Sequence, residues 1–255
     1  MRVRATVSYD GTDYSGFQRQ LNAATVQEVL EAVLAQVTQD PITVVAAGRT
    51  DAGVHALGQV IAFDTGWRHG LDDLERAFNA VLPPDVAVRA VAEAGASFHP
   101  RYDARVRHYR YTVMNAAVRA PIGRRYHLHV PYPLDTHRMQ EAARHLVGEH
   151  DFATFGQPPG GEETRRHVYR ATWSRETCPR AGLGINGDED GLLAFDIEAN
   201  GFLYRMVRSI VGTLLDVGQG RMSVSEFEEA LASCERSCAG KTAEPQGLCL
   251  MRVDY

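Results

Sequence analysis

Both halves of the chain carry the same order of sequence patterns: a strand, a helix, strands, a second helix and a strand. In the first half, alternating apolar residues predict the strands, at 2–9, 42–47, 59–64 and 86–91. Apolar residues at helical spacing predict one helix after a capping box of Thr25 and Glu28, and another from Leu71 to Val81. Mixed, largely antiparallel sheets backed by helices fit this order better than a doubly wound sheet. The expected fold class is therefore α+β.

The second half repeats the order with predicted strands at 107–114, 168–174, 192–198 and 248–253. Three helices are predicted in this half. The first begins at Asp135 and extends through Leu146 and Val147, the second begins near Met206, and the third is a short helix capped by Ser225 and Glu228. The repetition predicts two similar α+β domains, 1–104 and 105–255, hinged near 95–106. The loop at 178–191, rich in glycine and acid, has no predicted function.

Composition excludes several classes of protein. With 255 residues the chain can bury a sizeable core, and the absence of any long run without charge argues against a membrane span. The N-terminal alternation is typical of a strand and not of a signal peptide, so a cytoplasmic location is expected. The four cysteines form no CxxC pair, and the two nearby histidines, His127 and His129, lack a third ligand, so no metal site is predicted.

Charge is distributed unevenly along the chain. The formal net charge of -5 by itself argues against a polyanionic partner. Between 101 and 125, however, a single acid, Asp103, accompanies seven arginines: Arg101, Arg105, Arg107, Arg110, Arg119, Arg124 and Arg125. Local basic stripes, and not total charge, mark a surface that binds a phosphate backbone. A solvated arginine-rich face is the alternative interpretation.

The loop at 47–56 contains one acid, Asp51, close to Gly48 and Gly53 and directly after the predicted strand 42–47. A strand that ends at an acid flanked by glycines can present a carboxylate into a cleft, with backbone close on both sides. The alternative is ordinary turn chemistry, in which the aspartate side chain bonds its own backbone.

Three further segments carry functional residue types. The strand at 107–111 places Tyr109 and Tyr111 on one face, and aromatic rings interleaved with arginines suit the stacking of an unpaired base; core tyrosines are the alternative. At 201–208, Arg208 heads an apolar helix one turn after Arg205 and requires either a carboxylate partner, for which Asp51 is a candidate, or water. Leu248 follows a glycine, and core packing is its default role.

These segments together resemble a known family. The segment 47–56 is similar to the signature of the pseudouridine synthases, and specifically of the tRNA pseudouridine synthase A family. Further blocks match the family in the same order along the chain: 9–11, 16–20, 25–27, 79–83, 98–101, 107–111, 202–212, 239–240, 242–243 and 247–248. The loop at 178–191 is longer than is usual in that family.

The resemblance implies the pseudouridine synthase fold, with two similar domains around a central catalytic cleft. It implies isomerisation of uridine to pseudouridine at positions 38, 39 and 40 of the tRNA anticodon stem-loop, by a homodimer that uses no cofactor and no metal. The N1–C1′ glycosidic bond breaks, the uracil turns and C5 joins C1′. A carboxylate suits cleavage at an anomeric carbon, where positive charge develops.

The resemblance also assigns site residues. Asp51 matches the catalytic aspartate, Arg208 its basic partner, Tyr109 the tyrosine that stacks on the target base, and Leu248 an apolar contact that closes the pocket. Beside Asp51, Arg49 is expected to fill the gap left by the flipped base or to hold a phosphate. The remaining candidates for substrate contact are Gln18, Arg101, Arg105, Arg107, Arg165 and Arg166.

Two other functions compete with this one. A glycosidase or nucleosidase would use Asp51 as nucleophile, but it would need a second carboxylic acid, and no other acid occupies a comparable loop. A non-catalytic RNA-binding module would tolerate the loss of Asp51.

Overall fold

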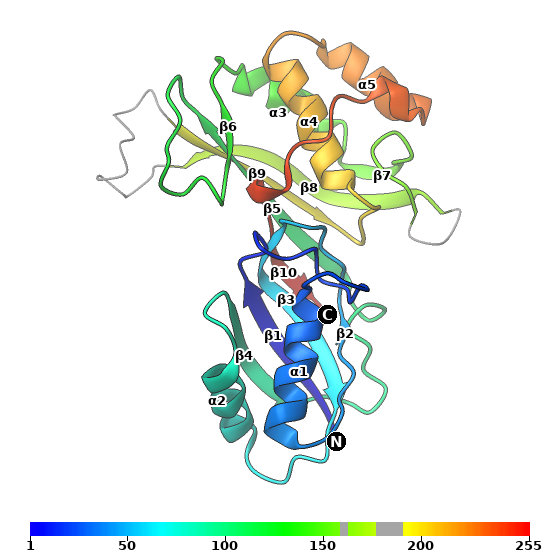
Figure 1. Ribbon diagram of the computed structural model, residues 1–255. Coiled ribbons are helices and arrows are strands. Elements are labelled where there is room, and N and C mark those ends of the chain that lie inside the picture. Colours follow the sequence, from blue (N-terminus) through cyan, green and yellow to red (C-terminus); the bar gives the residue numbers. More distant parts are fainter. Residues whose placement is uncertain (159–162, 177–190) are drawn as a thin grey trace. The chain divides into compact units, whose positions relative to one another are not determined.

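The computed structural model describes residues 1–158, 163–176 and 191–255, which form two compact units (Figure 1). Unit 1 comprises Met1–Arg105 and Cys249–Tyr255, and unit 2 comprises Val106–Leu248. Each unit combines helices with a mixed sheet in which antiparallel pairs outnumber parallel ones. The expected α+β class is therefore confirmed.

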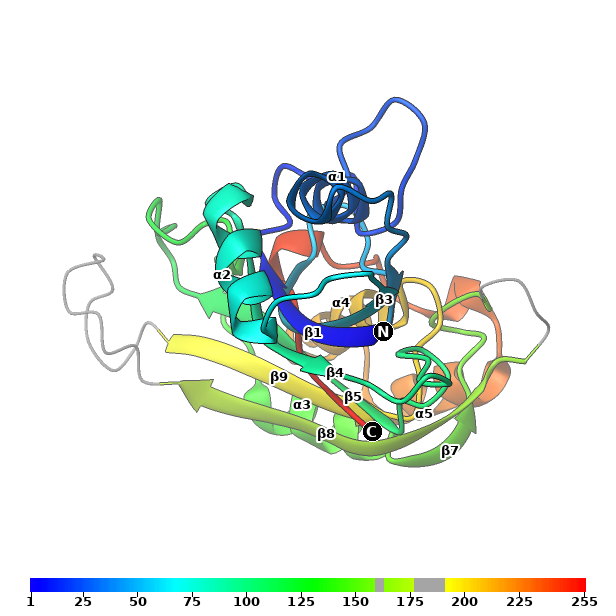
Figure 2. The same ribbon diagram turned by 90° about the horizontal axis from the view of Figure 1, so that it is seen from below.

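Unit 1 contains two helices and a sheet in the order β4-β1-β3-β10, with β2 paired to β3. Its elements are β1 (Arg2–Tyr9), α1 (Val26–Thr38), β2 (Val45–Ala46), β3 (His55–Asp64), α2 (Leu71–Val81), β4 (Val86–Glu93) and β10 (Leu248–Asp254). Figure 2 shows α1 and α2 on the same side of β1. The alternating buried residues of β1 face the core, as the period-two pattern predicts.

Helix α1 begins where the capping pattern places it. Thr25 is extended and its side chain accepts the Glu28 N–H (3.4 Å). The apolar stripe of α1 then buries Val26, Leu30 and Leu34 completely. Capping and stripe thus fix both the start of the helix and the face that it turns to the sheet.

The predicted strand 42–47 is shorter in the structure, where only Val45–Ala46 pairs with β3. Glu31, an acid on the buried side of α1, accepts the Val44 N–H (3.0 Å), so this backbone group bonds a helix side chain and not a neighbouring strand. In contrast, the predicted strand 59–64 begins earlier, at His55, because β1 and β10 both pair with its first residues.

Unit 2 places its helices against a sheet in the order β5-β9-β8-β7, with β6 parallel to β5. Its elements are β5 (Val106–Asn115), β6 (Leu128–Val130), α3 (Thr136–Arg144), β7 (Gly148–Asp151), β8 (Arg165–Glu176), β9 (Gly191–Ala199), α4 (Met206–Gly218), α5 (Val224–Ser233) and two 3-10 turns, Arg236–Cys238 and Pro245–Gly247. Most residues of α4 are buried, so this helix forms the centre of the unit.

Two helix boundaries in unit 2 differ from the prediction. Asp135 caps α3 as expected, but the helix ends at Arg144, before Leu146 and Val147. The cap of α5 is Ser223 with Glu226, and not Ser225 with Glu228. Ser223 is the last extended residue, so Ser225 lies inside the first turn, where its hydroxyl is not a cap.

The last strand also differs from the predicted grouping, which placed it in 105–255. In the structure β10 runs parallel to β3, with Cys249 opposite His55 and Leu250 opposite Ala56, so Cys249–Tyr255 belongs to unit 1. The pattern of the strand gave no sign of its pairing partner.

The 178–191 loop lies, except for Gly191, outside the described residues. Among the described helices, none has the length and apolarity needed to cross a membrane.

Candidate active site

The Asp51 loop, residues 47–54, joins β2 to β3 and is tied to β3 by its own backbone. The Ala47 N–H donates to the Val60 carbonyl (2.8 Å), and the fully buried Gln59 donates its side-chain amide to the Gly48 carbonyl (2.8 Å). The Asp51 carbonyl accepts the Val54 N–H (3.1 Å), which closes a tight turn. Asp51 itself is half-buried in this turn.

The segment 9–17 holds the other side of the Asp51 loop. The Phe17 N–H donates to the Thr50 carbonyl (3.0 Å), and the Gly53 N–H donates to the Tyr14 carbonyl (3.3 Å). Gly16 has a φ of +99°, and a Cβ built on it would lie 2.8 Å from the Thr50 carbonyl oxygen. Only glycine combines this backbone conformation with so close an approach. The glycines in the segments 9–11 and 16–20 thus pack against the loop that carries Asp51.

Two predicted substrate contacts lie beside Asp51 within unit 1. Arg49 is exposed on the same loop, and Gln18 is exposed directly after Phe17, whose backbone bonds Thr50. The structure therefore brings Arg49, Asp51 and the Gln18 segment together.

Tyr109 lies on β5 in unit 2, on the buried face of the strand, as the alternation predicts. Its ring meets the Phe202 ring edge-on, with the centroids 5.1 Å apart. Tyr111 is completely buried, packs on Gly247 and donates its hydroxyl to the Glu244 carbonyl (2.7 Å). Burial raises the pKa of the Tyr111 phenol. Tyr111 is therefore a core tyrosine.

Arg208 lies in the first turn of α4 and is oriented by the segment 241–243. Its Nε donates to the Ala243 carbonyl (2.8 Å), while the Ala243 N–H donates to the Arg208 carbonyl (3.0 Å). Gly212, one turn further along α4, lies so close to this segment that a Cβ would be 1.8 Å from the Lys241 oxygen. Close packing of the segment on the helix thus holds the Ala243 carbonyl within hydrogen-bond distance of the guanidinium group.

The other residues near α4 are arranged as follows. Arg205 precedes the helix in a left-handed conformation, and its guanidinium lies 4.8 Å from the Tyr204 ring centroid. Leu248 is buried directly after Gly247. Arg205 and Arg208 thus have different surroundings, although they lie close together in the sequence.

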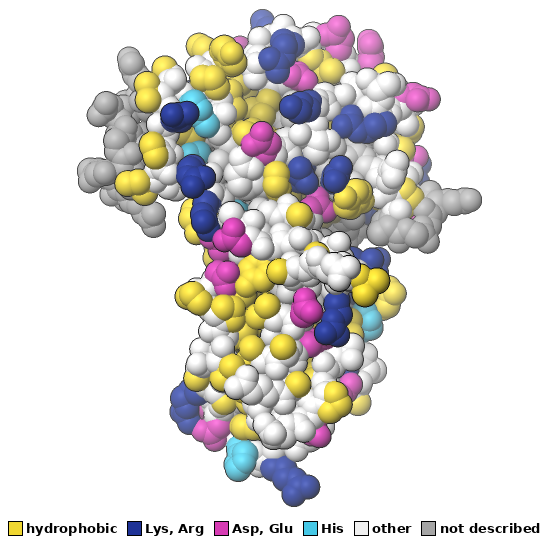
Figure 3. Space-filling model, in the orientation of Figure 1, with side chains coloured by type: hydrophobic (Ala, Val, Ile, Leu, Met, Phe, Trp, Pro, Cys, Tyr) yellow, Lys and Arg dark blue, Asp and Glu magenta, His cyan; other side chains and the backbone are white. Residues whose placement is uncertain are grey.

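The predicted phosphate contacts are distributed over both units. Unit 1 holds Arg101, which lies over the Tyr102 ring, and Arg105. In unit 2, Arg107 donates to the Asn200 carbonyl (2.8 Å) and Arg165 pairs with Glu149 (3.2 Å). Arg166 donates to the carbonyls of Glu163 and Arg165, and burial lowers its pKa. In Figure 3 the basic side chains of unit 2 form several separate groups on the visible face, and not one continuous stripe.

The sequence matches known proteins over nearly its whole length. The family model described as tRNA pseudouridine synthase matches residues 5–103 and 142–255. The tRNA pseudouridine synthase A of Brevibacillus brevis is 46% identical to this chain over 257 residues, and the match covers 100% of this chain and 99% of that protein. Those of Geotalea uraniireducens and Streptococcus thermophilus are 43% and 40% identical, each covering 100% of this chain and 99% of their own.

The chain belongs to the tRNA pseudouridine synthase family. It is therefore an isomerase that modifies tRNA. Within residues 1–158, 163–176 and 191–255, no three His, Cys, Asp or Glu side chains gather in a way that could hold a metal ion.

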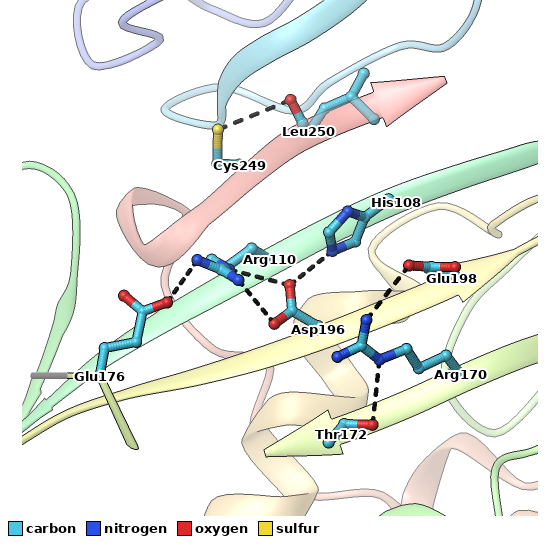
Figure 4. Close-up of polar contacts among 9 residues, drawn as sticks. All are labelled: His108, Arg110, Arg170, Thr172, Glu176, Asp196, Glu198, Cys249 and Leu250. Carbon is cyan, nitrogen blue, oxygen red and sulfur yellow. Dashed lines mark hydrogen bonds and ion pairs between the residues drawn. The ribbon is translucent and has the colours of Figure 1, made fainter. Parts of the chain in front are cut away.

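In this tRNA pseudouridine synthase, the face of β5 opposite Tyr109 carries a charged network (Figure 4). The buried Asp196 on β9 accepts hydrogen bonds from His108 Nε2 (2.6 Å) and from Arg110 Nε and Nη2 (both 3.0 Å), and Arg110 also pairs with Glu176 (2.5 Å). Burial by itself raises the pKa of Asp196, but the His108 and Arg110 bonds and charges outweigh it and lower the pKa to about 2. The network therefore ties β5 to β9 directly behind Tyr109.

The lowered pKa of Asp196 predicts loss of stability in acid. Because the folded-state pKa lies below the unfolded one, the stabilisation is present above about pH 4 and is lost as the pH falls toward 2. Between pH 5 and pH 3 the wild-type protein should lose about 1 kcal/mol more unfolding free energy than Asp196→Asn. Urea unfolding at both pH values measures this difference. The variant of an exposed residue, Asp40→Asn, should lose as much unfolding free energy between pH 5 and pH 3 as the wild type. An equal loss in Asp196→Asn would contradict the prediction.

Several residues that support the site were not predicted from the sequence. Tyr9 bonds Thr50, the neighbour of Asp51, while Phe202 packs on Tyr109 and the Ala243 carbonyl accepts from Arg208. Each of these contacts comes from a distant part of the chain. Asp196 had a local signal, because it is one acid inside the apolar strand that continues to Ile197. An acid at such a position needs a partner, and Arg110 lies directly opposite it in the β5–β9 ladder.

Proposed function

We propose that this chain isomerises uridine to pseudouridine at positions 38, 39 and 40 of the tRNA anticodon stem-loop. The observation that carries the proposal is the half-buried Asp51 on a loop framed by glycines, in a chain that matches the tRNA pseudouridine synthase family along most of its length. In the reaction the N1–C1′ bond breaks, C5 bonds to C1′, the C5 hydrogen leaves and N1 gains one. Neither redox state nor atom count changes.

The proposed roles follow the family resemblance at the matched positions. Asp51 is the catalytic carboxylate, which acts at the anomeric carbon, at the base or on a sugar proton, and Arg208 is its basic partner. Tyr109 stacks on the target base and Leu248 closes the pocket. The fixed orientation of Arg208 by Ala243 supports its role, because a preorganised charge needs no reorganisation during the reaction.

Substrate binding requires the target uridine to leave the helical stack, at a cost of a few kcal/mol. We assign Arg49 to the gap left by the base or to a phosphate. We assign Gln18 to substrate contact, and the contacts with the tRNA backbone to Arg101, Arg105, Arg107, Arg165 and Arg166. The proposal includes a homodimer that shares one tRNA. A tRNA substrate also favours a cytoplasmic location.

Tritium release tests the proposed function. Transcripts of tRNA labelled with tritium at uridine C5, each with a single uridine among positions 38, 39 and 40, are incubated with the protein. We expect tritium to be released from each of the three transcripts without free uracil. Free uracil would instead indicate a nucleosidase, and tRNA binding without release would indicate an RNA-binding module.

Arg208→Ala should lower turnover more than tRNA affinity. Removal of one preorganised charge commonly costs about 10²-fold or more in turnover, whereas tRNA binding is shared among many contacts. Single-turnover tritium release and filter binding measure the two effects. Arg205→Ala is the matched control, because it removes an exposed arginine from the position that directly precedes α4. This variant should keep wild-type turnover. If Arg208→Ala changed only affinity, its role as partner of Asp51 would be wrong.

A further inference from the structure

We propose that the hydroxyl pair of Tyr9 and Thr50 is a positioning device for Asp51. This inference rests on the proposed function, since it assumes that Asp51 acts on the substrate. The Tyr9 hydroxyl and Thr50 Oγ1 are 2.8 Å apart and hydrogen-bonded to each other. Tyr9 ends β1 and Thr50 directly precedes Asp51, so the bond links a strand of the sheet to the loop that carries the acid.

Both members of the pair are shielded from water. Tyr9 is 4% exposed and Thr50 is 6% exposed, so water is a poor substitute for the lost partner when either hydroxyl is removed. The Tyr9 ring also packs against Phe17, with the ring centroids 6.2 Å apart. Phenylalanine in place of Tyr9 would keep this packing and remove only the hydroxyl.

Thr50 is held at its main chain as well as at its side chain. Its carbonyl accepts the Phe17 N–H, and Gly16 lies against the same carbonyl. The β-branched side chain of threonine has few χ1 rotamers, so a bond at Oγ1 restrains the backbone of the residue. The two attachments together fix the peptide that leads into Asp51.

The hydrogen bonds that join the loop to β3 and to the segment 9–17 are mostly between backbone groups, which restrain the path of the loop but do not act at Thr50 Oγ1. Misplacement of a reacting group by about 1 Å can cost 10²-fold in rate. Loss of the Tyr9–Thr50 bond should therefore lower turnover without removing any group that touches the tRNA. A purely structural role would lower stability alone.

The experiment compares Tyr9→Phe, Thr50→Val and the double variant in single-turnover tritium release, per mole of folded protein. We expect each single variant to lose 10- to 100-fold in turnover with KM within about twofold of wild type. The double variant should be no slower than the slower single variant, because both remove the same bond. Thr50→Ser, which restores the hydroxyl, should recover turnover to within about threefold.

Tyr14→Phe is the matched control. Tyr14 lies in the same segment, is similarly buried, and its hydroxyl donates to Asp85 (3.0 Å) and not to the Asp51 loop. This variant should lose at least as much thermal stability as Tyr9→Phe and keep wild-type turnover.

Two results would overturn the inference: wild-type turnover in Tyr9→Phe and Thr50→Val, or multiplicative losses in the double variant. An equal loss of turnover in Tyr14→Phe would overturn it as well, since the effect would then follow stability. If Asp51→Asn were active, both this inference and the site assignment would fail. If Asp51→Asn were inactive and Tyr9→Phe fully active, only this inference would fail.

Discussion

Asp51→Asn is expected to abolish tritium release from labelled tRNA and to leave tRNA affinity within about twofold of wild type. Asparagine has nearly the same shape as aspartate, so the turn closed by the Val54 N–H and the Asp51 carbonyl is retained. The amide, however, can neither attack the ribose nor accept a proton as the carboxylate does. Loss of a catalytic group typically costs on the order of 10⁴-fold or more in turnover.

Asp40→Asn is the control for this prediction, because Asp40 is an exposed aspartate in the same unit, just beyond the end of α1. It should have wild-type turnover and affinity. Residual turnover above about 1% in Asp51→Asn, in a preparation free of wild-type protein, would show that the carboxylate is not the catalytic group.

Gly212→Ala should lower both stability and turnover. In the interior of an ordinary helix, alanine is favoured over glycine by roughly 0.5–1 kcal/mol. Here the sign reverses, because the new Cβ would lie 1.8 Å from the Lys241 carbonyl oxygen, a backbone atom that cannot rotate away. Overpacking of this kind typically costs 1–3 kcal/mol. The displaced segment includes Ala243, whose carbonyl orients Arg208, so turnover should fall as well.

Urea unfolding and tritium release measure the two effects of Gly212→Ala. Gly95→Ala is the matched control, since a Cβ at Gly95 meets nothing within 4 Å. This control should change the free energy of unfolding by no more than about 0.5 kcal/mol and leave turnover unchanged. If Gly212→Ala were as stable and as active as wild type, the close packing of 241–243 on α4 would not be what holds Arg208.

Local sequence patterns predict the elements of this fold and the candidate acid because their signals are local. The alternation of β1, the cap at Thr25 and the glycines around Asp51 each involve residues a few positions apart. The supports of the site involve long separations. Tyr9 lies 41 residues from Thr50, and Arg208 lies 35 residues from Ala243. No periodicity reports such pairs, because they depend on which strands become neighbours.

One error in the predicted elements has the same origin. The segment 42–47 has the composition of a strand, but the carboxylate of Glu31 on α1 takes the Val44 N–H. A carboxylate on the apolar side of a helix was not expected to bond a neighbouring strand. The error at the start of α5 is local instead. Ser223 and Ser225 both precede acids three residues later, and only the backbone shows which serine is the cap.

The return of the last strand to unit 1 has a consequence for the order in which the protein forms on the ribosome. Strand β10 follows all of unit 2 in the chain, yet it lies beside the start of β3, next to the Asp51 loop. Until β10 emerges, the main-chain groups of β3 near His55 and Ala56 lack this neighbour and form an exposed edge, a known template for aggregation. The part of the molecule that is synthesised first is thus completed last.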